Sequence, residues 1–105
     1  MNRVRHASGV RRDIARLTRW YREKGHTPDH VIVAELKQVT DQLLHNPTQY
    51  AKVPGCPATR DVRITATKKR KMIVIYETTG TEVVILSLSH KSAKRRPWRK
   101  RLDEA

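Results

Sequence analysis

The side chains of this chain that are best suited to chemistry are one histidine and two arginines. Cleavage of RNA without a metal ion requires a base for the 2′-hydroxyl proton, cations for the phosphate and an acid for the leaving oxygen. His90 follows the last expected strand, and imidazole exists in both proton states near neutral pH. Arg60 and Arg63 lie at an earlier expected strand and could reach His90 across a sheet. These residues form the candidate catalytic set; the alternative is that His90 only caps its strand or binds a backbone carbonyl.

Two basic clusters are candidate contacts for a nucleic acid or another macromolecular target. The first is Lys68, Lys69, Arg70 and Lys71, in an expected turn, and the second is Lys94, Arg95, Arg96, Trp98 and Arg99. An aromatic ring among cations can stack on a base or anchor in a partner protein. Both clusters also have plainer interpretations: a solvated turn for the first, and a tryptophan that folds back onto the core for the second.

The sequence offers no pattern typical of a metal or cofactor site. His26 and His30 are four residues apart, but they straddle an expected helix start and have no third ligand nearby. Gly55 and Gly80 are isolated turn glycines and do not make a phosphate-binding loop. The single cysteine, Cys56, excludes a disulfide within the chain and fits a reducing cytoplasm. We therefore expect no metal, no cofactor and no small-molecule substrate.

Charge points to a polyanionic partner. The 105 residues carry 23 Lys and Arg against 10 Asp and Glu, a formal net charge of +13. Such a surplus is typical of proteins that bind nucleic acid, an anionic membrane or an acidic protein. No apolar run is long enough to span a membrane, and the arginine-rich start lacks the apolar core of a signal peptide. We expect a soluble cytoplasmic protein with no membrane partner, folded as a single domain over residues 1–105 with a basic tail from about 91 to 105.

Two amphipathic helices are expected in the first half of the chain. Val10, Ile14, Leu17 and Tyr21 recur at spacings of four, three and four, which is one apolar stripe of a helix. Ser8 is its expected N-cap and Gly25 its expected end, while Arg12, Arg16 and Arg19 line another face.

The second helix is expected between Thr27 as N-cap, with Pro28 at its first position, and Pro47 just beyond its end. Its apolar stripe consists of Ile32, Leu36, Val39 and Leu43. Two such helices joined by a short loop predict a helical hairpin on one face of a sheet.

Strands are expected in the remainder of the chain. Residues 72–76 are apolar at consecutive positions, which predicts a central strand, and residues 83–89 pass into an alternating pattern, which predicts one wetter face. Gly80 lies in the turn between them. Residues 62–66 alternate as a strand with one buried face, and residues 2–6 are expected as a short edge strand. The predicted fold is therefore α+β, a helical hairpin packed on a small antiparallel sheet in the order (β)ααβββ.

This order of elements resembles the RelE/ParE superfamily of toxins from type II toxin–antitoxin systems. The resemblance covers roughly residues 8–98 and rests on residues 43–47 (LLHNP), Gly55, Arg60, residues 72–76 (MIVIY) and residues 85–90 (ILSLSH) followed by basic residues. It implies a growth-inhibiting toxin neutralised by a cognate antitoxin, which the basic charge leads us to expect to be acidic. RelE-like members cleave mRNA on the ribosome, whereas ParE-like members poison DNA gyrase and are not nucleases.

The ParE-like branch is the preferred interpretation. The long paired helices and the ending at residues 90–98 look more like that branch, and no tyrosine follows Tyr76, whereas RelE-like members usually have one near the C-terminus. Whether the protein is an enzyme depends on this choice: a RelE-like endoribonuclease would use His90, Arg60 and Arg63. A third possibility, of another class, is a non-toxic basic module that binds nucleic acid; it accounts for the charge but not for the order of elements.

Overall fold

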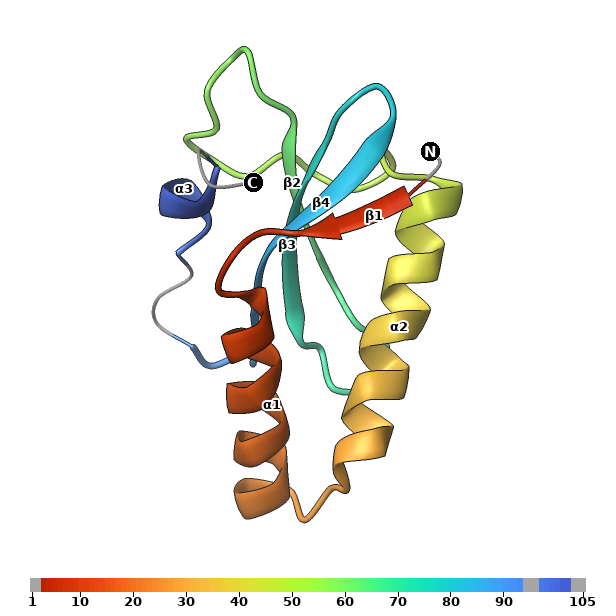
Figure 1. The fold of residues 1–105 in the computed structure, drawn as a ribbon, viewed down its shortest axis with the longest axis vertical. Helices are drawn as coiled ribbons and strands as arrows, with labels where there is room; N and C mark the ends of the chain where they lie inside the picture. The colour runs from red at the N-terminus through yellow and green to blue at the C-terminus, as the bar shows by residue number, and fades with distance from the viewer. Residues whose placement is uncertain (1–2, 94–96, 103–105) are drawn as a thin grey trace.

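Strands and helices follow one another in the predicted order along the chain (Figure 1). The computed structural model describes residues 3–93 and 97–102. The described elements are β1 (Arg3–His6), α1 (Val10–Lys24), α2 (Asp29–His45), β2 (Val62–Ala66), β3 (Ile73–Thr78), β4 (Glu82–Ser89) and α3 (Trp98–Arg101). The α+β class is therefore confirmed.

The sheet is mixed, which corrects the antiparallel prediction. Its strand order is β1-β4-β3-β2, and β3 pairs antiparallel with both β2 and β4. β1 is an edge strand, as expected, but it runs parallel to β4, with Arg3 opposite Glu82 and His6 opposite Ile85. Only residues 7–9 connect β1 to α1, and α1 packs against β4. The direction of β1 is therefore set by where α1 must begin, which a strand pattern does not encode.

Both middle strands are buried on both faces. This confirms the prediction for β3, whose β-branched residues Ile73, Val74 and Ile75 suit a pleated surface covered on both sides. It overturns the wetter face expected for β4, because every residue from Val83 to Leu88 is buried, with Ser87 only 1% exposed. β4 lies between β1 and β3 and contacts both α1 and α3, so its alternation of Leu and Ser does not reflect exposure to solvent.

The N-caps of the two long helices each lie one residue later than predicted. The N-cap of α1 is Gly9, with φ of 91°, rather than Ser8, and no side chain caps it. The N-cap of α2 is Pro28, while the Thr27 hydroxyl donates to the Gly25 carbonyl at 3.1 Å. Both predicted ends are confirmed: Gly25 is the C-cap of α1, and α2 stops at His45 before Asn46 and Pro47.

The C-terminal segment closes the sheet on its second face. α3 and α2 lie on opposite sides of the sheet (Figure 1). Trp98 and Leu102 belong to the buried core, at 8% and 7% exposed. The part of the expected basic tail that the structure describes thus includes a short docked helix, α3, and the interpretation of Trp98 as folding back onto the core is confirmed.

A buried ion pair joins α1, β4 and α3. The Arg101 guanidinium binds both carboxylate oxygens of Asp13 and also donates to the Leu86 carbonyl at 2.9 Å. The backbone N–H of Leu88 donates to Asp13 Oδ2 at 3.0 Å. β1 pairs with β4 only as far as Ile85, so these two side chains satisfy backbone groups of β4 where its neighbouring strand has ended. Gly9 permits the approach, because a Cβ there would lie 2.9 Å from Arg101 Nη2.

We expect Asp13→Ala to lower the free energy of unfolding by about 3 kcal/mol or more, because it leaves a buried guanidinium and a strand N–H without an acceptor. Urea unfolding followed by circular dichroism measures this. Arg22→Ala is the matched control on α1: it removes an ion pair with Asp29 in which both side chains are at least half exposed, and should change stability little. Equal losses in the two variants would show that the Asp13–Arg101 pair has no special structural role.

Candidate functional site

The predicted catalytic residues lie at opposite ends of the sheet. Arg60 binds Glu77 near the end of β3, and Arg63 is opposite Tyr76. His90 follows Ser89, which is opposite Ile73 at the start of β3. Ile73 and Glu77 are four residues apart on one strand, or about 13 Å at the rise of an extended chain. The structure does not bring the imidazole and the two guanidinium groups into one site.

Arg60 and Arg63 both hold other parts of the chain in place. Arg60 forms a bidentate ion pair with the buried carboxylate of Glu77, and its guanidinium donates to the Leu102 carbonyl at 3.2 Å. Arg63 pairs with Asp61 at 2.9 Å, and its Nη1 donates to the carbonyls of Thr48 and Tyr50 at 3.0 and 2.6 Å. A phosphate could engage either guanidinium only in competition with these bonds.

The Lys68–Lys71 cluster is partly structural as well. Arg70 binds the buried carboxylate of Glu35 through its guanidinium at 2.6 Å and its backbone N–H at 2.9 Å. The Tyr21 hydroxyl donates to the Arg70 carbonyl at 3.4 Å. The turn is therefore docked on α1 and α2, while Lys68, Lys69 and Lys71 are exposed and remain candidates for target contact.

The described residues of the C-terminal basic cluster are structural as well. Lys94, Arg95 and Arg96 lie outside the described residues. Trp98 is buried, so it could stack on a base only if α3 left the sheet. The Arg99 guanidinium lies 5.0 Å from the centre of the Trp98 ring and donates to the Gly55 carbonyl at 3.1 Å, which holds α3 against the connection after α2.

His90 instead lies in a pocket whose residues are far apart in the sequence and were not predicted to come together. The pocket, of about 440 Å³, lies between one face of α1 and the end of β4, and we call it the α1–β4 pocket. The His90 ring stacks on Trp20, with centres 4.4 Å apart and planes inclined by 10°. Its Nδ1 accepts the Ser92 backbone N–H at 3.2 Å, so in the neutral ring the proton is on Nε2. The other lining residues are Asp13, Arg16, Leu17, Arg19, Glu23, Ser87, Leu88, Ser89, Ala93 and Pro97.

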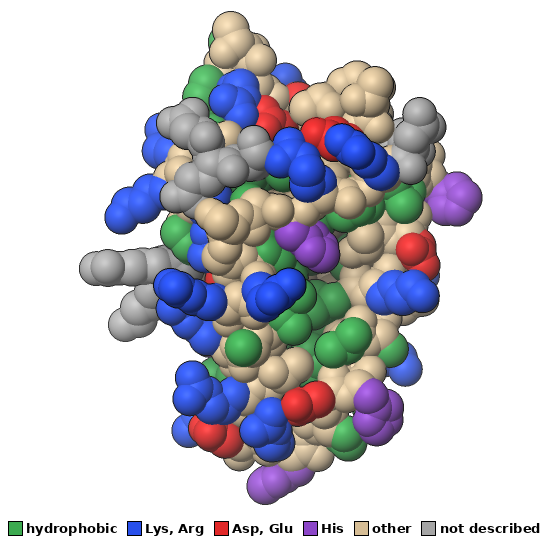
Figure 2. Space-filling model, in the orientation of Figure 1, with side chains coloured by type: hydrophobic (Ala, Val, Ile, Leu, Met, Phe, Trp, Pro, Cys, Tyr) green, Lys and Arg blue, Asp and Glu red, His purple; other side chains and the backbone are tan. Residues whose placement is uncertain are grey.

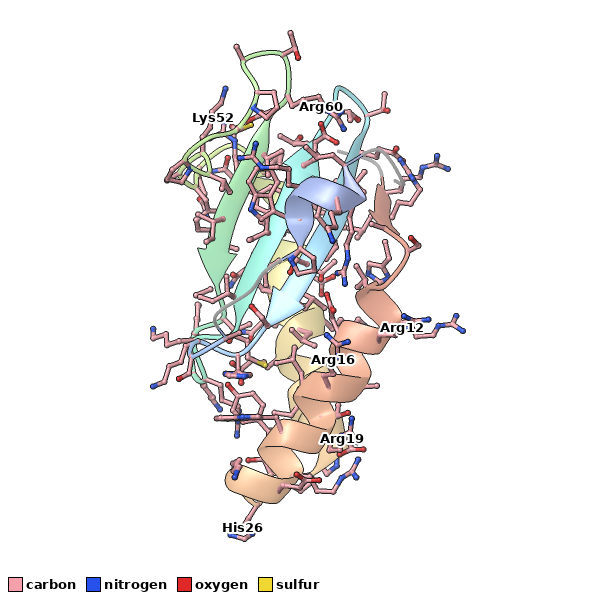
Figure 3. All side chains as sticks on the ribbon, turned by 90° about the vertical axis from the view of Figure 1, so that its left-hand side faces the viewer. Arg12, Arg16, Arg19, His26, Lys52 and Arg60 are labelled. Atoms are coloured by element: carbon pink, nitrogen blue, oxygen red, sulfur yellow. The ribbon has the colours of Figure 1, made fainter. Side chains whose placement is uncertain are left out.

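Basic side chains that pair with none of the described carboxylates also lie along α1. Lys and Arg side chains crowd the α1 side of the molecule in Figure 2, and Figure 3 shows Arg12, Arg16 and Arg19 along that helix. Within residues 3–93 and 97–102, no carboxylate forms an ion pair with any of these three. The helix face that they share could be read from the sequence. That Arg16 and Arg19 line the same pocket as His90 could not, because β4 follows α1 by some sixty residues.

A second hollow lies on the other side of α1. It has a volume of about 310 Å³, lies between α1 and α2 over β4, and we call it the α1–α2 groove. Hydrophobic side chains are visible in it in Figure 2. Its lining residues are His6, Ile14, Val33, Leu36, Lys37, Thr40, Ile85 and Leu88. Val33 is 49% exposed, so the groove presents accessible apolar surface together with Ile14.

Other kinds of site find no support in the part of the chain that is described. There, no three His, Cys, Asp or Glu side chains gather as metal ligands. None of the described helices combines the length and apolarity needed to cross a membrane. Scans of the chain against protein-family models, curated proteins and solved structures give no match.

We expect the Arg70–Glu35 contact to make stability depend on pH. Burial alone raises the pKa of Glu35, but hydrogen bonds from Thr67 and Arg70 and the charge of Arg70 outweigh it, so the net pKa is lowered. A lowered pKa in the folded state contributes stability above the unfolded value of about 4.3, and this contribution is lost as pH falls through the folded pKa.

The stability difference between the wild-type chain and Glu35→Gln should therefore be largest near neutral pH and shrink below about pH 4. Urea unfolding at several pH values measures it. Asp41→Asn, which removes an exposed carboxyl from the same helix, should leave the wild-type pH dependence unchanged. A difference for Glu35→Gln that stays constant with pH would contradict the assignment.

Proposed function

We propose that this protein is the toxin component of a type II toxin–antitoxin module, ParE-like, which inhibits growth by acting on DNA gyrase and is neutralised by a cognate acidic antitoxin. The resemblance to the RelE/ParE superfamily suggests the module, and the observed βααβββ order agrees with the order on which that resemblance rests. The observation that favours the ParE-like branch is the placement of Arg60 and Arg63: both are engaged in structural bonds, at the end of the sheet away from His90.

A RelE-like ribosome-dependent endoribonuclease is the second candidate. It is favoured by one observation, the presence of His90 in a pocket with Arg16 and Arg19, because an imidazole beside cations can serve proton transfer to or from a bound phosphate ester. The stacking of His90 on Trp20 weighs against it, since the ring is held on one face. The third candidate, a non-toxic nucleic-acid-binding module, would account for the arginines of α1 but would not explain the apolar α1–α2 groove.

The α1–α2 groove is the surface that we assign to the neutralising antitoxin. Apolar side chains line it, and the basic residues Lys37 and His6 also lie at it. An amphipathic helix with acidic flanks fits this chemistry: its apolar face would cover Ile14 and Val33, and its carboxylates would meet the basic residues. Neutralisation of the toxin would then include neutralisation of its charge.

The gyrase proposal predicts that the purified protein blocks supercoiling by DNA gyrase and traps cleaved DNA, while the mRNA of a translating extract keeps its 5′ ends. His90→Ala should inhibit gyrase as well as the wild-type chain does, because no proton transfer is required. Codon-phased cuts that appear only on ribosomes, and disappear in His90→Ala, would instead establish the endoribonuclease. Arg63→Ala is unsuitable for this comparison, since it would also release the carbonyls of Thr48 and Tyr50.

The groove assignment predicts that Val33→Glu separates toxicity from neutralisation. Val33 is half exposed, so the substitution should leave the fold and growth inhibition intact, while it places a carboxylate in the apolar groove and repels an acidic partner. Growth of cells that co-express the antitoxin from a neighbouring reading frame should therefore be inhibited by Val33→Glu. The control Gln38→Glu makes the same charge change at an exposed position of α2 outside the groove, and should still be neutralised. Equal neutralisation of both variants would exclude the groove.

A further inference from the structure

The α1–β4 pocket presents an arrangement of hydrogen-bond donors suited to a phosphate group. Arg16 and Arg19 are three residues apart on α1, so they are neighbours on one face of the helix, and both line the pocket. Guanidinium groups hold phosphate oxygens by paired, charge-assisted hydrogen bonds. The Nε2–H of the neutral His90 ring is a third donor among the lining residues.

The carboxylates of the pocket do not cancel these cations. Asp13 also lines it, but the Arg101 guanidinium and the Leu88 N–H occupy both of its oxygens. Among the described lining residues, Glu23 is the remaining acid, and it stands against Arg16 and Arg19. The lining therefore keeps a positive balance, and the ion pair that fixes α3 also prevents Asp13 from repelling an anion.

The rest of the pocket is shaped for something larger and flatter than an ion. The stacked rings of Trp20 and His90 form one aromatic element of its wall, and Leu17, Ala93 and Pro97 add apolar surface. Aromatic side chains of this kind bind bases by stacking or edge contact. A volume of about 440 Å³ is within the range typical of pockets that hold small organic ligands.

We propose that the α1–β4 pocket binds a nucleotide, with its terminal phosphate on Arg16 and Arg19 and its base against the Trp20–His90 wall. A free nucleotide and the phosphorylated end of a single strand present the same chemical group. The inference goes beyond the proposed function, because neither the action on gyrase nor the antitoxin groove uses this pocket. The nucleotide proposal can therefore fail while the toxin proposal stands, and the toxin proposal can fail while the nucleotide proposal stands.

Titration calorimetry with AMP, adenosine and inorganic phosphate tests the proposal on the full chain. An ionic strength of about 0.3 M screens the general attraction of a protein with net charge +13 for anions. We expect AMP to bind at least about tenfold more tightly than adenosine or phosphate, since each of these lacks one of the two recognised parts. Phosphate that binds as tightly as AMP would overturn the nucleotide assignment, and so would the absence of AMP binding at millimolar concentration.

Substitutions on α1 distinguish binding in the pocket from a general effect of the protein's net charge. Arg16→Ala and Arg19→Ala remove exposed side chains, so the fold should persist, and each should weaken AMP roughly tenfold. Arg12→Ala is the matched control: it removes the same charge from the same helix, at an exposed position that does not line the pocket. AMP affinity should be unchanged in it. An equal loss in all three variants would show a general electrostatic effect and refute the site.

Single strands of about five nucleotides, with and without a 5′-phosphate, identify the source of the ligand. A phosphorylated strand that binds more tightly than AMP supports the proposal with a strand end as the ligand, and AMP that binds as tightly as the strand supports it with a free nucleotide. Strands that bind equally with and without the terminal phosphate would contradict it, because the contact would then be with the backbone charge.

Discussion

The ion pair between Asp13 and Arg101 is the interaction on which the arrangement of this protein depends. It lies where β1 has ended and β4 continues, so the backbone of β4 has no strand neighbour on that side. Asp13 accepts the Leu88 N–H, Arg101 donates to the Leu86 carbonyl, and the two charges bind each other. One residue from each end of the chain thus completes the edge of a buried strand. Because both side chains are almost fully buried, neither can lose its partner without leaving an uncompensated charge.

This contact also positions α1 so that the helix separates two surfaces of different chemistry. On one side of α1, Ile14 faces an apolar groove shared with α2. On the other, Arg16 and Trp20 face a pocket that contains His90 and the end of β4. One surface suits an amphipathic protein segment, and the other suits a small ligand that carries both a phosphate and a ring. The same helix can therefore serve two partners without competition between them.

The distribution of the acids explains how a chain of net charge +13 folds and still presents a basic face. Asp13, Glu35 and Glu77 are buried, and each is bound by an arginine from a distant part of the chain. Glu82 likewise binds Arg3 and Arg5 across the β1–β4 pair. These acids neutralise arginines that hold the fold together. The arginines in the middle of α1 have no such partner among the described residues, so their charge remains for an external anion.

Apolar periodicity, β-branched runs and Gly or Pro at the ends are local signals, so the elements and their order could be predicted from the sequence. These signals placed α1, α2 and the β3–β4 hairpin, and they identified β3 as central. The direction of β1, the burial of β4 and the docking of α3 could not be predicted in this way, since each depends on residues far apart in the chain. The same reason separates the sites. Arg60, Arg63 and Arg70 looked like free cations in the sequence, but Glu77, Asp61 and Glu35 bind them after folding. His90 stacks on Trp20 and shares a pocket with Arg16 and Arg19, and does not lie near Arg60 and Arg63 as predicted. A charge is a property of one residue, whereas its partner is decided by the packing of distant segments.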